Sequence, residues 1–151
     1  GHKYLSGKTA VVYGDEDMAV GLTAWLAELG VKPLLVASGG GTGKLAGAIG
    51  EVTDGIVRQA PVVEDGTDFY ELAEQVRELK PDFLLGNSKG YKIASQAGVP
   101  LVRAGFPIHD RFGGQRLHHL AYQGAQELMD RIVNAMLAHR QEEAGLGWGY
   151  L

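Results

Sequence analysis

Lys8-Thr9-Ala10-Val11-Val12-Tyr13, followed by Gly14, is the stretch of sequence that decides the fold. It is short, apolar and rich in β-branched residues, which predicts a buried β-strand. Asp15 comes directly afterwards and has the side chain of a helix cap. The helix that it begins is expected to end at Gly30, because apolar residues recur at helical spacing up to that point. These residues are Met18, Leu22, Trp25, Leu26 and Leu29.

A second buried strand is expected at Leu34–Ala37, just after Pro33. A strand, a helix and a strand within about thirty residues form a βαβ unit with parallel strands and a right-handed crossover. The chain then continues the alternation. Further strands are expected at Asp82–Leu85, at Val99–Val102, and at either Ile56–Val57 or Val62–Val63.

Further helices are expected between these strands and after the last of them. They are a helix at Leu45–Val52, one capped by Thr67 and followed by Pro81, a short one capped by Asn87 or Ser88 and ended by Gly98, and a final one that runs to about Glu143. The whole pattern predicts an α/β fold. We expect a three-layer open parallel sheet of four or five strands, of the Rossmann or flavodoxin-like kind, with helices on both faces.

Length and composition limit the function. The chain has 151 residues, which suits a single α/β domain over residues 1–151 with a tail at 145–151. A net charge of −4 argues against nucleic acid or an anionic membrane as partner. No apolar run approaches the roughly 20 residues of a membrane span. The chain has no cysteine, so it cannot form disulfides or supply thiolate ligands. Because it starts without methionine, we expect an excised part of a longer protein.

Sites in open parallel sheets lie at the carboxyl ends of the strands. One loop expected there, Ser38–Leu45, resembles the phosphate loop G-x-x-x-x-G-K-[ST]. It has Ser38 where that motif needs the first glycine and Leu45 where it needs a hydroxyl. The sequence therefore favours a surface loop over a nucleotide-phosphate site. The candidate loops at this edge are Gly14–Asp17, Ser38–Lys44, Gly86–Gly90 and Arg103–His119.

Gly86-Asn87-Ser88-Lys89-Gly90 has the spacing of a nucleophile elbow, with Ser88 as the candidate nucleophile. However, no downstream histidine is matched to an obvious acid, and helix capping explains Ser88 without chemistry.

The segment Gly105–Leu120 carries six ionisable side chains and three glycines, and its pattern predicts an irregular connector. Asp110 and Arg111 are adjacent, and a local salt bridge is the simplest use of the pair. His109, His118 and His119 could ligate a metal, but no carboxylate or thiolate lies at a recognisable ligand spacing.

Three motifs together resemble the C-terminal domain of nitrogenase component 1 subunits. They are Tyr13-Gly14-Asp15 with the helix behind it, Lys80–Ser88 with its Gly-Asn-Ser end, and Val99–Arg111 with Gly-Phe-Pro-x-x-Asp-Arg, followed by Tyr122–Ala125 at the start of a long helix. The resemblance is closer to the β-type subunit, or to its relative in cofactor assembly, than to the α-type.

The resemblance implies a subunit of three similar domains that pairs with a homologous subunit into heterodimers and heterotetramers in the cytoplasm. Such complexes act in nitrogen fixation, carry iron–sulfur or iron–molybdenum-type clusters, and take electrons from an ATP-dependent iron protein. The cluster cysteines belong to the preceding domains, so this domain alone is expected to hold no cofactor and to be inert. The alternatives are the same domain of the cofactor-assembly scaffold, or a stand-alone flavodoxin-like module that binds a small anion.

The resemblance also selects the candidate site residues. Lys89 stands where α-type subunits have a loop lysine near the organic acid of their cofactor, and Leu120 stands where they have a metal-ligating histidine. Direct cluster ligation by this domain is therefore not expected, and no catalytic or metal-ligating residue is assigned. The candidates for facing a cofactor are Lys89, His109, Arg111, Gly113, Gly114, Arg116, His118 and His119.

Overall fold

The computed structural model of the chain describes residues 2–66, 68–87, 90–104 and 115–148, with the side chains of 126–142 in the last range. This part contains one parallel sheet of five strands in the order β3-β2-β1-β4-β5. The α/β prediction is confirmed. The order is that of the Rossmann fold rather than the flavodoxin-like order. The strands are β1 (Thr9–Tyr13), β2 (Lys32–Ser38), β3 (Val62–Asp65), β4 (Phe83–Gly86) and β5 (Leu101–Arg103).

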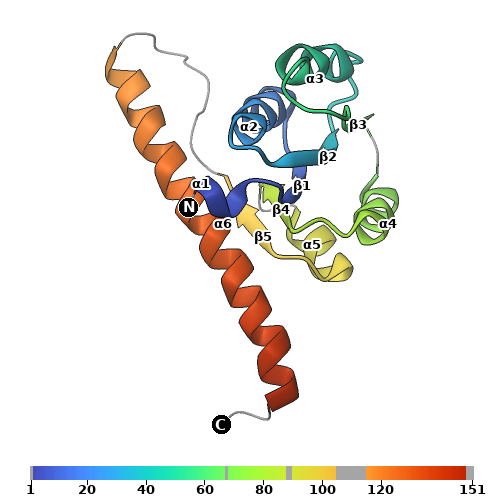
Figure 1. Cartoon of the computed structure of the whole chain (residues 1–151). Coiled ribbons are helices and arrows are strands. Elements are labelled where there is room, and N and C mark those ends of the chain that lie inside the picture. The colour runs from blue at the N-terminus through green and yellow to red at the C-terminus, as the bar shows by residue number, and fades with distance from the viewer. Residues whose placement is uncertain (1, 67, 88–89, 105–114, 149–151) are drawn as a thin grey trace.

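Helices cover both faces of the sheet, as expected (Figure 1). Four helices share one hydrophobic core with the sheet, and two share the other. On the first face lie α1 (His2–Leu5), α2 (Glu16–Glu28), α3 (Leu45–Thr53) and α6 (Gln115–Trp148); on the second lie α4 (Phe69–Leu79) and α5 (Tyr91–Ala97).

The two cores follow from the alternation of side chains along the central strands. Ala10 and Val12 of β1 belong to the core under α2 and α6, whereas Val11 and Tyr13 belong to the core under α4 and α5. The edge strands β3 and β5 are only partly buried, whereas the strands β1, β2 and β4 are largely buried on both faces, as a parallel sheet covered by helices requires. Their near-continuous apolar runs are the reason that the sequence identified them.

Helix ends agree with the prediction at Asp15, Gly30 and Gly98. The Asp15 carboxylate accepts a hydrogen bond from the Met18 backbone N–H at 2.8 Å and caps α2. Gly30, with φ +83°, and Gly98, with φ +73°, lie at the ends of α2 and α5 in the left-handed conformation. At α5 the Val99 N–H donates to the Ala94 carbonyl at 3.0 Å, which completes a Schellman motif.

Two predicted caps are wrong. The N-cap of α4 is Asp68 rather than Thr67, and its carboxylate accepts from the Glu71 N–H at 2.9 Å. A carboxylate at that place also interacts favourably with the helix dipole. The N-cap of α5 is Gly90, which makes no side-chain cap, rather than Asn87 or Ser88. This helix begins later than expected because the Gly90 N–H first closes a turn onto the Asn87 carbonyl at 3.0 Å.

Several element positions also differ, and β2 begins at Lys32 and so includes Pro33, which was expected to precede it. The third strand is at Val62–Asp65, so the Ile56–Val57 alternative is wrong. The last strand begins at Leu101, because Val99 belongs to the end of α5. Helix α6 begins at Gln115 and reaches Trp148, which overturns both the irregular connector over 115–120 and the tail from 145. Extending an existing helix adds one hydrogen bond per residue, whereas nucleation is the costly step.

Candidate functional site

The carboxyl edge of the sheet has its topological switch point between β1 and β4, where ligands bind in folds of this kind. The two strands approach very closely there. A Cβ on Gly86 would collide with the backbone carbonyl oxygen of Tyr13, so this position accepts only glycine without a backbone shift. The switch point divides the edge into a β2–β3 half, made by Ser38–Lys44 and Asp65, and a β4–β5 half, made by Gly86, Asn87, Gly90, Arg103 and Ala104.

The β2–β3 half is a closed structure. The backbone N–H groups of Gly41 and Gly43 donate to the two carboxylate oxygens of Asp65, at 2.8 and 2.7 Å. The Thr42 hydroxyl donates to the Glu16 carboxylate at 2.9 Å and ties the loop to the start of α2. An internal carboxylate therefore occupies the N–H groups that a phosphate loop would offer to its ligand. The geometry does not support a nucleotide-phosphate site, and the loop is on the surface, as expected.

Tyr13 lies under this edge on the face of α4 and α5. Its side chain is only 7% exposed, and its ring packs against that of Phe69 with the centroids 5.6 Å apart. Burial raises the pKa of the Tyr13 phenol above its ordinary value, because desolvation disfavours the phenolate. The phenol is therefore neutral at physiological pH and acts as packing material rather than as an acid or base.

The β4–β5 half is where the predicted site segments leave the sheet. The Ala104 N–H donates to the Gly86 carbonyl at 2.9 Å, so the last described residue after β5 lies beside the end of β4. The Arg131 guanidinium of α6 donates to the Arg103 carbonyl at 3.3 Å. Residues 88–89 and 105–114 therefore depart from neighbouring strand ends, and α6 holds the second of these ends in place.

The predicted site residues fall into two groups. Lys89, His109, Arg111, Gly113 and Gly114 lie outside the described residues, as do Ser88 and Asp110. The other predicted residues, Arg116, His118 and His119, lie in the first turns of α6 rather than in a loop, and their side chains are not described.

The donor set does not fit an iron–sulfur cluster. Such clusters are held chiefly by cysteine thiolates, and this chain has no cysteine. In the part of the chain that the structure describes, no group of three His, Asp or Glu side chains could hold a metal ion. Among the helices in the described ranges, none is long and apolar enough to cross a membrane. That the domain alone carries no cluster stays a prediction.

Sequence reasoning missed the role of Asp65. The stretch 46–66 gave only weak strand and helix signals, and the partner loop lies more than twenty residues upstream. The available signal was an acidic residue at the end of an apolar run, followed by Gly66, whose φ is +91°. An acid in that position can cap a neighbouring glycine loop only if β3 lies beside β2.

The fold and its edge define a Rossmann-type α/β domain whose candidate site lies at the β4–β5 half of the sheet. Comparison with known sequences identifies the family. The chain belongs to the nitrogenase component 1 type oxidoreductases, whose family model matches residues 1–137. The resemblance inferred from the three motifs is confirmed.

Individual relatives agree with a β-type chain. The chain is 37% identical over 147 residues to the nitrogenase molybdenum-iron protein beta chain of Methanothermobacter thermautotrophicus, covering 93% of this chain and 30% of that one. It is 34% identical over 155 residues to the nitrogenase iron-iron protein beta chain of Rhodobacter capsulatus, covering 98% of this chain and 32% of that one. The chain thus spans about a third of the length of these relatives.

Solved structures with a similar fold include a nitrogenase. A structure of nitrogenase Cp1 at pH 6.5 matches with a TM-score of 0.70 and 30% identity, over 95% of this chain and 31% of that one. A short-chain dehydrogenase/reductase from Serratia marcescens matches with a TM-score of 0.51 at 17% identity, over 84% of this chain and 71% of that one, which shows the shared fold alone.

Proposed function

We propose that this chain is one α/β domain, the C-terminal one, of a β-type subunit in a nitrogenase-like reductase complex that acts in nitrogen fixation. The observation that carries the proposal is the family match over residues 1–137, together with relatives named as beta chains. Because the chain spans about a third of those relatives, the reductase activity belongs to the whole subunit and its complex. The domain by itself is inert.

In the proposed complex, different domains have different roles. Clusters of the iron–sulfur or iron–molybdenum type are held by cysteines outside this chain, since it has none. This domain contributes a rigid sheet and a polar rim that faces a cofactor or a partner. The rim consists of Lys89, His109, Arg111, Gly113, Gly114, Arg116, His118 and His119. Its support is the neighbouring placement of Gly86 and Ala104, from which the segments carrying Lys89 and His109 depart.

The proposed partners are a homologous subunit, in a heterodimer or heterotetramer, and an ATP-dependent iron protein that delivers electrons. The complex works in the cytoplasm. Charge is consistent with a protein partner, because the net charge of −4 disfavours nucleic acid.

The test is to purify the whole protein anaerobically together with its homologous subunit. We expect co-purification, several iron atoms per complex, and ATP-dependent substrate reduction when the iron protein is added. A complex that binds iron and passes a cluster to an apo-reductase, but does not turn over, would favour the cofactor-assembly scaffold instead. A monomer without iron would contradict both and leave the small-anion module.

A further inference from the structure

A cationic pocket lies at the amino edge of the sheet, on the opposite side from the candidate site at the carboxyl edge. Its volume is about 440 Å³, and its walls come from the start of β1, the ends of α4 and α5, and the described part of α6. Among the residues that line it, four carry a permanent positive charge and one is a carboxylate. The cations are Lys8, Arg77, Lys80 and Arg140, the carboxylate is Asp82, and His139 lies beside them.

The single carboxylate offsets only one of the four positive charges. One oxygen of Asp82 accepts hydrogen bonds from the Thr9 N–H at 2.8 Å and from the Thr9 hydroxyl at 3.2 Å, so its role is to hold β1 against β4. The Lys8 ammonium lies 4.9 Å from the centroid of the Tyr4 ring. The Arg77 guanidinium donates to the Gln96 carbonyl oxygen at 3.4 Å. Lys8, Lys80 and Arg140 form no salt bridge within the described part of the chain. A concentration of positive charge is therefore left open to solvent in a chain whose net charge is −4.

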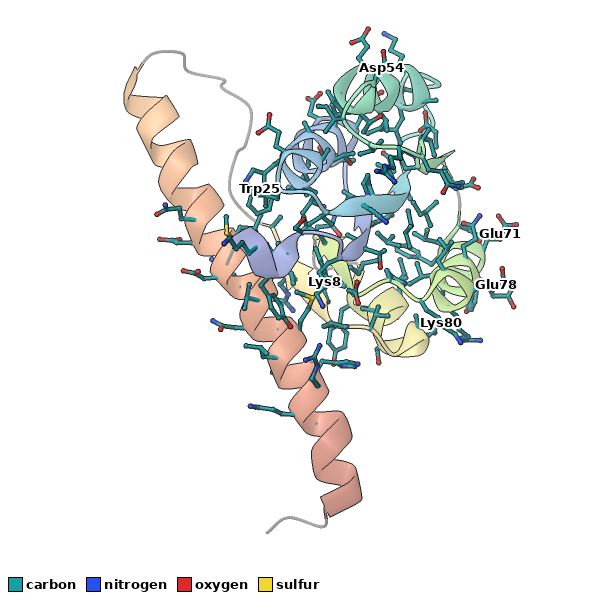
Figure 2. The ribbon with its side chains drawn as sticks, in the orientation of Figure 1. Lys8, Trp25, Asp54, Glu71, Glu78 and Lys80 are labelled. Carbon is teal, nitrogen blue, oxygen red and sulfur yellow. The ribbon has the colours of Figure 1, made fainter. Side chains whose placement is uncertain are left out.

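Lys80 supplies a second, independent observation. It has φ +49° and is the only non-glycine residue with positive φ in the described part of the chain. Its N–H ends α4 by donating to the Val76 carbonyl at 3.0 Å, a place where glycine is the usual residue because a Cβ is strained there. Figure 2 shows Lys80 at the end of α4 and Lys8 at the start of β1. Keeping a long cationic side chain at a strained position indicates that the side chain has a use.

We propose that this amino-edge pocket binds a small multivalent oxyanion of the phosphate class. Arginine guanidinium groups match such oxyanions with paired N–H donors, and lysines add point charges. The volume suits a small ligand. A docking surface for a protein normally carries aromatic or large apolar anchors. The exposed aromatic side chains Phe69, Tyr70 and Tyr91 line a different hollow between α4 and α5, and none of them lines this one.

The test is calorimetric titration of the chain with inorganic pyrophosphate, with sulfate at matched ionic strength as the comparison. We expect a dissociation constant below about 1 mM for pyrophosphate and at least tenfold weaker binding of sulfate. Lys80→Gly should weaken pyrophosphate binding about tenfold, while its thermal midpoint stays unchanged or rises, because glycine relieves the strained backbone.

Lys44→Ala is the matched control, since Lys44 is an exposed lysine at the carboxyl edge. It should leave the affinity within about twofold of the original. Absence of pyrophosphate binding at millimolar concentration would overturn the proposal. Equal binding of sulfate, or equal losses in Lys80→Gly and Lys44→Ala, would overturn it too, because either result means non-specific charge screening.

Discussion

The two halves of the carboxyl edge differ in how their polar groups are used. In the β2–β3 half, a glycine-rich loop that resembles a phosphate loop closes on Asp65 and Glu16 of the same chain. In the β4–β5 half, backbone hydrogen bonds from Ala104 and Gly90 organise the strand ends, and the charged segments leave from there. In the β2–β3 half, side chains of the same chain accept the hydrogen bonds of the loop. In the β4–β5 half, the hydrogen bonds fix only the points from which the charged segments depart. The glycine-rich motif of the β2–β3 half therefore serves the fold, and the site is proposed at the other half.

The largest expected effect tests whether α6 holds the β4–β5 half. Ile132 of α6 is 0% exposed in the core beside β5. Ile132→Ala should lower the free energy of unfolding by about 2–5 kcal/mol, because it leaves a buried cavity. Leu137→Ala, at 40% exposure on the same helix, is the control and should cost below about 1 kcal/mol. Equal losses in urea melts would show that α6 does not pack as described.

The next effect tests the boundary between the halves. Gly86→Ala places a Cβ against the Tyr13 carbonyl oxygen, so the strands β1 and β4 must separate. A loss of about 3 kcal/mol is expected, at the upper end of ordinary overpacking. In α3, Gly47 has open space around its Cβ position, and Gly47→Ala should be neutral or stabilising by about 0.5–1 kcal/mol. A Gly86→Ala chain as stable as the original would refute the close approach.

A smaller effect tests the closed β2–β3 half. Asp65→Ala removes the acceptor for two backbone N–H groups and should cost about 1 kcal/mol, since the freed groups can turn to water. Amide exchange of Gly41 and Gly43 should accelerate in the same variant. Asp54→Ala, at the exposed end of α3 (Figure 2), should change stability by less than about 0.5 kcal/mol. Unchanged exchange at Gly41 would mean that Asp65 does not hold the loop.

A pH dependence of stability tests the burial of Tyr13, the last residue of β1, beneath the carboxyl edge. Burial raises the pKa of Tyr13 in the folded state, so the folded chain keeps this proton when the unfolded chain has lost it. The stabilisation is complete below the unfolded pKa of about 10, and it falls as pH rises from there through the raised folded pKa. Tyr13→Phe should therefore lose less stability than the original between about pH 9 and pH 11. Parallel stability–pH curves for the two chains would count against a buried phenol.

The pattern of apolar residues predicted most of the fold, because the central strands are buried on both faces and the helices have apolar faces. The α2 cap at Asp15 and the glycine ends at Gly30 and Gly98 were predictable, since local chemistry sets them. The choice of Asp68 over Thr67 was not, because two adjacent residues could both cap and the first turn decides between them. The start of α6 at Gln115 was not predictable, because a segment with many ionisable side chains and several glycines is typical of a connector.

The candidate site was less predictable than the fold. The motif of the loop Ser38–Lys44 favoured a surface loop over a phosphate site. The contact of this loop with Asp65 could not be predicted, because it forms only when β3 lies beside β2. The amino-edge pocket combines Lys8, Arg77, Lys80 and Arg140 from segments scattered over most of the chain. No local pattern contains such a cluster, because only the strand order and helix packing bring its members together.

The central claim is that the β4–β5 half faces a partner or cofactor in the complete protein, whereas the β2–β3 half serves the fold. The measurement that tests it most directly is the double substitution Arg111→Ala with Arg116→Ala, made both in this chain and in the whole protein. In this chain we expect the free energy of unfolding to stay within about 0.5 kcal/mol of the original, as for surface sites. In the whole protein we expect loss of subunit pairing in sedimentation or loss of iron, which Asp65→Ala should not cause. Unfolding of the chain itself, or a whole protein that keeps its pairing and its iron, would contradict the claim.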